Sequence, residues 1–261
     1  MSKLGITLDS KTNVFFPNSE VNGILNLNTN EEHKIKQISV TIIGRAYVCF
    51  EELHGDEKSL DIFTFKTMHF YINVNTLLWK YNGMNQLSNG QNLFPFKFEI
   101  PSNAAPNLSE KHGDIVYYVK ANIEFYGKKR SKVQYYGFSV CPIIDLNLSP
   151  ELKLPTSVNS TKTIKNCFSR SENSLKVTMS LPTTGFVCGE IIPLKIDICN
   201  KTSLKIKSLE YGIGLKCTYT GNTGKSFFYP PFTHIKEQSL TLETNVVKAI
   251  LMEIKIKKKV F

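Results

Sequence analysis

The 261-residue sequence lacks any long apolar run, which excludes a membrane-spanning helix of about 18 or more consecutive apolar residues. Its first twelve residues have no apolar core before Asp9, so no secretory signal peptide is expected. No two of its six cysteines have the C-x-x-C spacing of a zinc knuckle or a redox motif, which predicts free thiols that serve mostly as small core residues. These absences together predict a soluble intracellular protein.

Signatures of catalysis and metal binding are also missing. The five histidines are scattered and form no H-E-x-x-H pair, and no G-x-S-x-G elbow, Walker loop or strand-linked G-x-G-x-x-G is present. The acidic residues on both sides of His54 favour a solvated hairpin loop over an acid/base pair; they are Glu51, Glu52, Asp56 and Glu57. We therefore expect no enzyme activity, no metal and no cofactor.

Acidic residues are outnumbered, with 22 against 32 basic residues and a formal net charge of +10. The excess is concentrated in two candidate anion- or partner-binding clusters. One lies at an expected hairpin tip and the other near residue 261; they are Lys128, Lys129, Arg130 and Lys132, and Lys255, Lys257, Lys258 and Lys259. Either these lysines only solvate a loop and protect an edge strand, or they bind phosphorylated tails, inositol phosphates or anionic lipid. No RNP-like or helix-turn-helix pattern accompanies them, so nucleic acid is not an expected partner.

Apolar residues recur at every second position along the chain, a period that places one face of a β-strand in a core. Two such sets are predicted to be buried: Ile38, Val40 and Ile42, and Leu209, Tyr211 and Ile213. Turn formers such as Asn82–Gly83 and the 221–224 stretch interrupt the strands at short intervals. Many short strands of this kind predict an all-β protein of sandwich architecture, with less than about one residue in ten in helix.

The pattern repeats within the chain at a shift of 170 to 171 residues. Leu4, Ile6 and Leu8 fall on Leu175, Val177 and Met179, and later matches keep the same order. The repeat predicts two tandem Ig-like sandwiches: residues 1–150, a linker at 151–172, and residues 173–261. The second copy is shorter than the first, so it is expected to lack some of its last strands.

Several motifs resemble landmarks of the arrestin family, most closely the arrestin-domain-containing proteins or α-arrestins. They follow the family's order along nearly all of the first domain and half of the second: Val14-Phe15-Phe16-Pro17-x-x-Glu20-Val21-x-Gly23, Lys36-x-Ile38-x-Val40-x-x-x-Gly44-x-Ala46, Leu87-x-x-Gly90-x-x-x-Phe94-Pro95-Phe96-x-Phe98-x-Ile100-Pro101, Gly113-x-Ile115-x-Tyr117-x-Val119-Lys120-Ala121, and Gly185-Phe186-x-x-Gly189-Glu190-x-Ile192.

The resemblance implies a non-catalytic adaptor in membrane-cargo trafficking, endocytosis or receptor signalling. Its implied partners are cytoplasmic tails of membrane proteins, ubiquitin ligases or endocytic machinery, and anionic lipid. Its implied location is the cytoplasm, peripheral to the plasma membrane or endosomes. The family's Pro-Pro-x-Tyr motif is not found; the nearest string is Tyr229-Pro230-Pro231-Phe232-Thr233. The alternative is a structural coat subunit resembling the arrestin-fold component of retromer.

Overall fold

The computed structural model divides the chain into two compact units. The first comprises Met1–Ile143 and Tyr219–Lys236, and the second comprises Ile144–Thr218 and Glu237–Phe261. The structure describes residues 3–30, 34–56, 59–127, 131–141, 145–163, 174–187, 189–202, 205–206, 209, 211, 213–223, 233–241 and 251–252. Within these ranges every regular element is a β-strand apart from short turns of 3-10 helix, which confirms the all-β prediction.

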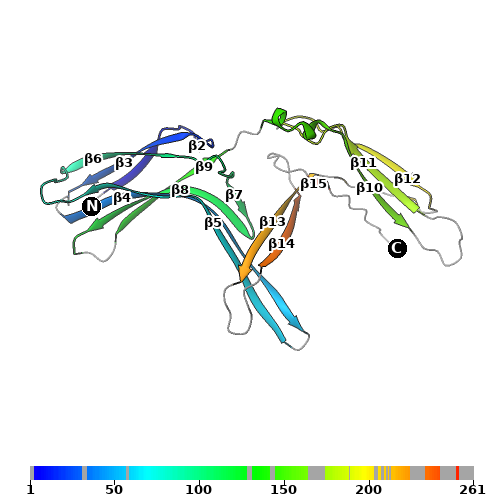
Figure 1. Ribbon diagram of the computed structural model, residues 1–261, viewed down its shortest axis with the longest axis horizontal. Helices are drawn as coiled ribbons and strands as arrows, with labels where there is room; N and C mark the ends of the chain where they lie inside the picture. Colours follow the sequence, from blue (N-terminus) through cyan, green and yellow to red (C-terminus); the bar gives the residue numbers. More distant parts are fainter. Residues whose placement is uncertain are drawn as a thin grey trace. The chain divides into compact units, whose positions relative to one another are not determined.

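The smaller sheet of the first unit has three antiparallel strands in the order β1–β3–β6 (Figure 1). Their bounds are Lys3–Leu8 for β1, Glu20–Thr29 for β3 and Gly90–Glu99 for β6. Side chains of β3 alternate strictly, with Val21, Leu25 and Leu27 buried and the residues between them largely outside. This alternation gives the sheet one apolar face.

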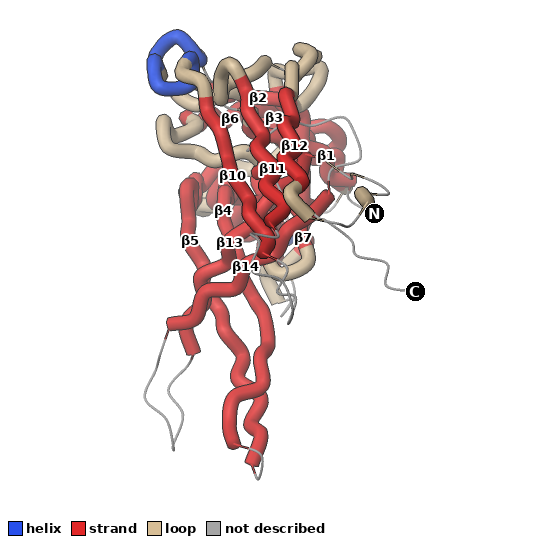
Figure 2. Tube along the Cα trace, turned by 90° about the vertical axis from the view of Figure 1, so that its right-hand side faces the viewer, coloured by secondary structure: helices blue, strands red, loops and turns tan. Residues whose placement is uncertain are grey.

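The larger sheet has the order β14–β13–β5–β4–β8–β9–β2, and β7 pairs with β8. Its strands are β2 (Val14–Phe15), β4 (Ile35–Asp56), β5 (Ser59–Lys80), β7 (Leu108–Glu110), β8 (Gly113–Phe125), β9 (Lys132–Val140), β13 (Ile213–Thr223) and β14 (Thr233–Thr241). Figure 2 shows the β4–β5 hairpin extending well past the other strands of the first unit. The hairpin expected around His54 is present, since β4 pairs with β5 up to Asp56 opposite Ser59, but residues 51–56 lie in strand β4 rather than in a loop.

The core of the first unit lies between these two sheets. Ile38, Val40 and Ile42 of β4 are fully buried, as predicted, and pack in one cluster with residues of β3, β6 and β8. Gly44 lies at a register shift between β4 and β5, and a Cβ there would come within 2.5 Å of the Tyr117 ring. The glycine thus allows the tyrosine ring to lie directly against the backbone.

Part of the β4–β5 hairpin packs against β13. The rings of Phe50 and Phe65 stack at 5.1 Å, and β13 pairs with β5 through Asn222 opposite Lys66. A Cβ at Gly221 would lie 2.7 Å from Cβ of Phe65. The turn predicted for residues 221–224 is therefore wrong at Gly221, where the missing side chain admits Phe65 and the strand continues to Thr223.

The second unit contains a three-stranded sheet in the order β10–β11–β12. The strands are β10 (Thr156–Thr163), β11 (Ser174–Leu181) and β12 (Lys195–Asn200), and two 3-10 turns precede them at Leu146–Leu148 and Pro150–Lys153. Val177, Met179 and Leu181 form the buried face of β11. β10 lies inside the stretch taken as a linker, and its mostly polar side chains leave it largely exposed. A short strand, β15 (Leu251–Met252), pairs with Ile213 and Gly214 of β13.

Two sequence predictions about burial are wrong. Tyr211 is 66% exposed and Leu209 only half-buried, because both precede the start of β13 at Ile213 and neither pairs with a strand in the described part of the chain. The side chain of Ile213 is not among those described. Among the described cysteines, Cys141 and Cys199 are exposed while Cys217 is buried, so these thiols are not mostly core residues. No helix in the described part of the chain is long and apolar enough to cross a membrane.

Candidate functional site

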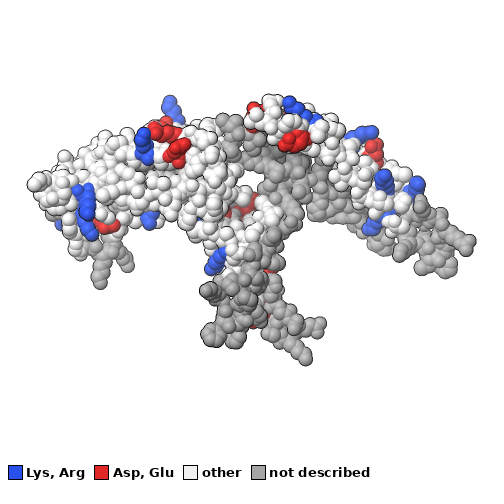
Figure 3. All heavy atoms as spheres, viewed as in Figure 1, with Lys and Arg blue, Asp and Glu red and all other residues white. Residues whose placement is uncertain are grey.

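Most of the predicted basic residues lie outside the part of the chain that the structure describes. They are Lys128, Lys129, Arg130, Lys255, Lys257, Lys258 and Lys259. Lys132 is described and begins β9, half-buried and opposite Ile123 of β8. Figure 3 shows basic and acidic side chains interspersed over the visible face of the described residues, so that face has no charge patch of one sign.

The outer edge of β9 is the candidate binding site, because part of its backbone has no neighbouring strand in the described ranges. β8 pairs with β9 on one side from Lys132 to Phe138, whereas β2 pairs on the other side only at Ser139 and Val140. The N–H of Ser139 donates to the carbonyl of Asn13 at 2.8 Å, and the N–H of Cys141 donates to that of Phe15 at 2.9 Å. Because alternate residues of a strand direct their backbone groups to the same side, Val133, Tyr135 and Gly137 also face this edge. No strand within the described ranges pairs with them there.

A turn at Asn13 precedes β2. Asn13 has a φ of 54°, in the left-handed region that asparagine tolerates better than most residues. Its Oδ1 accepts a hydrogen bond of 2.9 Å from the hydroxyl of Tyr136 on β9. The turn thus fixes the start of β2 against the end of β9.

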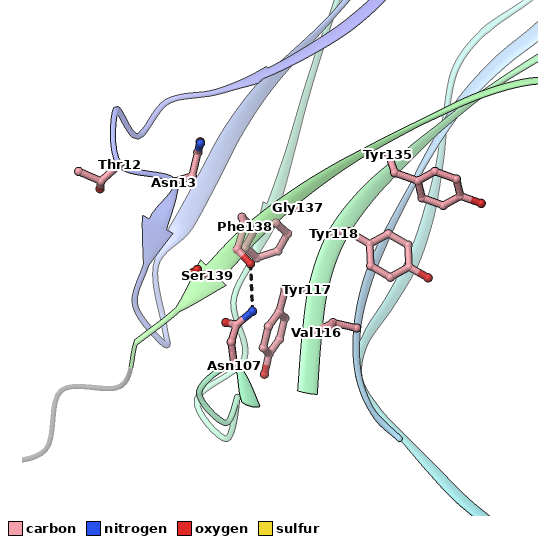
Figure 4. Close-up of a pocket in the computed structure, with 10 residues that line it drawn as sticks. All are labelled: Thr12, Asn13, Asn107, Val116, Tyr117, Tyr118, Tyr135, Gly137, Phe138 and Ser139. Carbon is pink, nitrogen blue, oxygen red and sulfur yellow. Dashed lines mark hydrogen bonds between the residues drawn. The ribbon is translucent and has the colours of Figure 1, made fainter. Parts of the chain in front are cut away.

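Asn107 anchors the inner side of β9, and Tyr117 anchors the neighbouring strand β8. Asn107 accepts from the N–H of Val140 at 2.7 Å and donates to the carbonyl of Phe138 at 3.3 Å, so it continues the ladder where β8 pairing ends (Figure 4). The hydroxyl of Tyr117 on β8 donates to the carbonyl of Ala105 at 2.6 Å. Burial, together with the neighbouring Tyr71, raises the pKa of Tyr117 to about 12, so the hydroxyl stays protonated and keeps this bond at neutral pH.

A shallow pocket of about 530 Å³ opens beside the same stretch of β9 (Figure 4). Gly137 lies opposite Tyr118 in the ladder, and the rings of Tyr118 and Tyr135 meet edge to face at 5.7 Å. A Cβ added at Gly137 would have its nearest neighbour, the Tyr117 carbonyl, at 3.9 Å, so the space above this glycine is empty. Thr12, Asn13 and Ser139 supply polar groups to the lining, which contains no charged side chain. Such a pocket suits an apolar or aromatic side chain rather than an ion.

An ion pair lies farther along the same face of the sheet, where Arg45 is opposite the pocket residue Val116. Arg45 of β4 contacts Asp114 of β8 at 2.7 Å, and its guanidinium lies 5.4 Å from the centre of the Tyr47 ring. Because both charges are satisfied within the protein, this group stabilises the sheet and offers little to a charged ligand.

The described residues contain no group of three or more His, Cys, Asp or Glu side chains able to hold a metal ion. Sequence reasoning missed the pocket, because its lining comes from segments more than 120 residues apart, such as Asn13 and Ser139. The available signal was Gly137 within the strand pattern that follows Tyr135 and Tyr136, since glycine inside a strand often marks a close approach by another backbone or a ligand.

Comparison with known proteins places both halves of the chain in one family. The model for "Arrestin (or S-antigen), N-terminal domain" matches residues 4–147, and that for "Arrestin (or S-antigen), C-terminal domain" matches residues 171–259. The chain is 26% identical over 113 residues to arrestin domain-containing protein 1 of Rattus norvegicus, covering 43% of this chain and 26% of that protein. It is 24% identical over 224 residues to arrestin domain-containing protein 5 of Homo sapiens, covering 80% and 60%.

The chain thus spans between about a quarter and three fifths of the length of these curated relatives. Among solved structures, that of Spo0M, a sporulation control protein from Bacillus subtilis, has 12% sequence identity and a TM-score of 0.33, over 76% of this chain and 79% of that one.

Proposed function

Because the chain belongs to the arrestin family, we propose that it is a non-catalytic adaptor that links membrane-protein cargo to trafficking, endocytic or signalling machinery. One observation carries the proposal: models of both arrestin domains match in order, over residues 4–147 and 171–259. A fold alone does not give a function, so the role is inferred from the family.

The proposal extends to organisation and location. Residues 1–150 would form the N-like sandwich, 151–172 the linker, within which β10 pairs with β11, and 173–261 a shortened C-like sandwich. The protein would act in the cytoplasm, peripheral to the plasma membrane or endosomes. In the string Tyr229-Pro230-Pro231-Phe232-Thr233, threonine stands where the Pro-Pro-x-Tyr motif has tyrosine.

The surface of the first unit is compatible with such a role. It offers an open strand edge on β9 and an uncharged pocket beside it, which are features that bind extended segments of other proteins. The two basic clusters, Lys128 to Lys132 and Lys255 to Lys259, are proposed to add contacts to anionic groups on a tail or membrane.

Proximity labelling in the native cell tests the proposal. The full chain fused to a labelling enzyme should enrich membrane proteins with cytoplasmic tails, together with endocytic or ubiquitin-ligase components, over the same enzyme free in the cytosol. A labelled set without membrane proteins would contradict the adaptor role. Native mass spectrometry of the purified complex separates the alternative, because a coat subunit would be recovered at fixed stoichiometry with the same few partners.

A further inference from the structure

We propose that the loop between β5 and β6, residues 81–89, inserts into membranes that contain anionic lipid. Met84 at its tip enters the apolar layer, and lysines around the loop contact the headgroups. The inference rests on the proposed function in one respect, because it names the surface through which the adaptor would contact the membrane. The observations behind it all come from the first unit, at the end where β6 begins (Figure 1).

Met84 is the most exposed of the large apolar side chains in the described part of the chain, at 93%. The residue before it, Gly83, has a φ of 92°, a conformation that favours glycine and turns the chain at this point. The loop itself contains no charged residue. Met84 therefore adds nothing to the core of the fold, while its apolar surface gains free energy wherever it can leave water.

Hydrogen bonds within the loop hold Met84 in this outward position. Oδ1 of Asn82 accepts from the N–H of Met84 at 3.0 Å and from that of Asn85 at 2.9 Å. Oδ1 of Asn85 accepts from the N–H of Asn82 at 2.8 Å, and its side-chain amide donates to the carbonyl of Lys80 at 2.8 Å. Leu87 is buried in the core and fixes the other end. Because three N–H groups at the tip are already bonded, moving the tip out of water leaves few backbone donors unsatisfied.

Aromatic rings lie at the base of the loop. The rings of Tyr81 and Tyr126 meet edge to face at 6.1 Å, and that of Trp79 lies 6.4 Å from Tyr81. The N–H of Tyr81 donates to the carbonyl of Lys36, and the N–H of Tyr126 donates to that of Lys34. Tyrosine and tryptophan favour the boundary between headgroups and acyl chains, because each has an apolar ring and a polar atom. They are thus placed for that boundary when Met84 enters the apolar layer.

The charge at this end of the unit is positive. Lys34 and Lys80 are exposed and form no ion pair with any described residue. The acidic residue on the adjoining strand, Glu124, already accepts from the amide of Gln37 at 2.8 Å and contacts Lys36 at 3.8 Å. An anionic leaflet attracts such lysines. Three more basic residues follow soon after β8 in the sequence: Lys128, Lys129 and Arg130.

A bilayer fits this surface better than a protein does. The tip offers one large apolar side chain, whereas a stable protein interface covers about 800 Å² on each partner. Two copies of a chain of net charge +10 repel each other, which disfavours association through the loop. Shallow apolar insertion and attraction to anionic headgroups are the two contributions that together give reversible membrane binding.

Cosedimentation of the full chain with vesicles tests the inference. The vesicles contain phosphatidylcholine with about 30% phosphatidylserine, to give an anionic surface, or phosphatidylcholine alone. The parent chain should bind the anionic vesicles at least about tenfold more tightly. Met84→Ser should weaken that binding at least about fivefold without changing its salt dependence, because it removes apolar burial and no charge. Its melting temperature should equal that of the parent chain, because Met84 is exposed.

Three variants complete the experiment. Met68→Ser is the matched control and should leave the affinity unchanged, because Met68 is also exposed but lies on β5 opposite Tyr47 of β4. Lys80→Gln should weaken binding up to about fivefold and reduce its salt dependence. The fluorescence that Met84→Trp adds to that of Trp79 should shift to the blue on anionic vesicles, and lipids brominated in their acyl chains should quench it.

Four results would overturn the inference. The parent chain could fail to bind the anionic vesicles, Met84→Ser could bind as tightly as the parent chain, or the added fluorescence of Met84→Trp could stay unshifted on bound vesicles. Sedimentation equilibrium could also reveal a dimer that Met84→Ser dissociates, which would make a second copy the occupant. The cellular labelling experiment is independent. If labelling finds no membrane cargo while Met84→Ser still weakens vesicle binding, the adaptor role fails and the membrane contact stands.

Discussion

Ile42 provides a quantitative test of the first unit's core. The side chain is fully buried on β4, opposite Val119 on β8, which is also fully buried. Replacing it with alanine removes three carbons, worth about 2.4 kcal/mol at about 0.8 kcal/mol for each buried methylene. Strands on both sides restrict collapse into the resulting cavity, so the total loss is expected to be about 3–4 kcal/mol, within the range for such substitutions.

Val74 is the matched control, because it lies opposite Ile42 on β5 but is 48% exposed. Val74→Ala should cost about 1 kcal/mol or less. The single tryptophan, Trp79, packs against this core, so its fluorescence during urea unfolding reports on the first unit. Ile42→Ala should lower the midpoint by about 1–2 M. Equal midpoints for the two variants, or an unchanged midpoint for Ile42→Ala, would refute the assignment of this face.

Three further predictions concern other parts of the first unit. Gly44→Ala should lower the melting temperature strongly, because the added Cβ would meet the Tyr117 ring, which a hydrogen bond to Ala105 holds in place. Gly5→Ala is the control and should change the melting temperature little. Equal melting temperatures for the two variants would contradict this prediction. The free energy of unfolding should fall as the pH rises from 10 to 12, because Tyr117 ionises near 10 when unfolded and only near 12 when folded, and urea titrations of Tyr117→Phe should lack this component. A variant with the first basic cluster neutralised should bind anionic vesicles more weakly, by about 1 kcal/mol per residue at most, and with a smaller salt dependence; the replaced residues are Lys128, Lys129, Arg130 and Lys132. Its melting temperature should not change, because surface charges contribute little to folding. Parent-like sedimentation with vesicles at two salt concentrations would rule out that role.

Local periodicity is enough to predict the strands and much of the core. Val40 and its neighbours are buried because a period of two places them on one face, and Val177 and Met179 follow the same rule in the second unit. The rule fails at Tyr211, where the apolar alternation continues but the ladder of β13 has not begun. Apolar alternation predicts which side chains are buried only where the segment pairs with neighbouring strands.

The candidate site depends on which strands become neighbours, and local sequence does not encode that directly. Tyr118 and Gly137 form one wall and the floor of the pocket only because β8 and β9 pair in one register. The edge of β9 before Ser139 is unpaired among the described residues because β2 runs parallel to β9 and begins only at Val14, opposite Ser139. Gly221 favours a turn locally, but it lies within strand β13, where it packs against Phe65, a residue distant in sequence. Such features are decided by tertiary packing.

The pairing of β13 with β5 has a consequence for synthesis of the protein. Lys66 meets Asn222 only after about 150 further residues have been translated, which takes roughly 8–30 s at typical elongation rates of about 5–20 residues per second. During that interval the aromatic part of the hairpin around Phe65 has no β13 beside it, while the remaining strands of the first sandwich have already left the ribosome. Nascent chains stalled before Tyr219 should therefore recruit chaperones through this hairpin and release them once β13 is made.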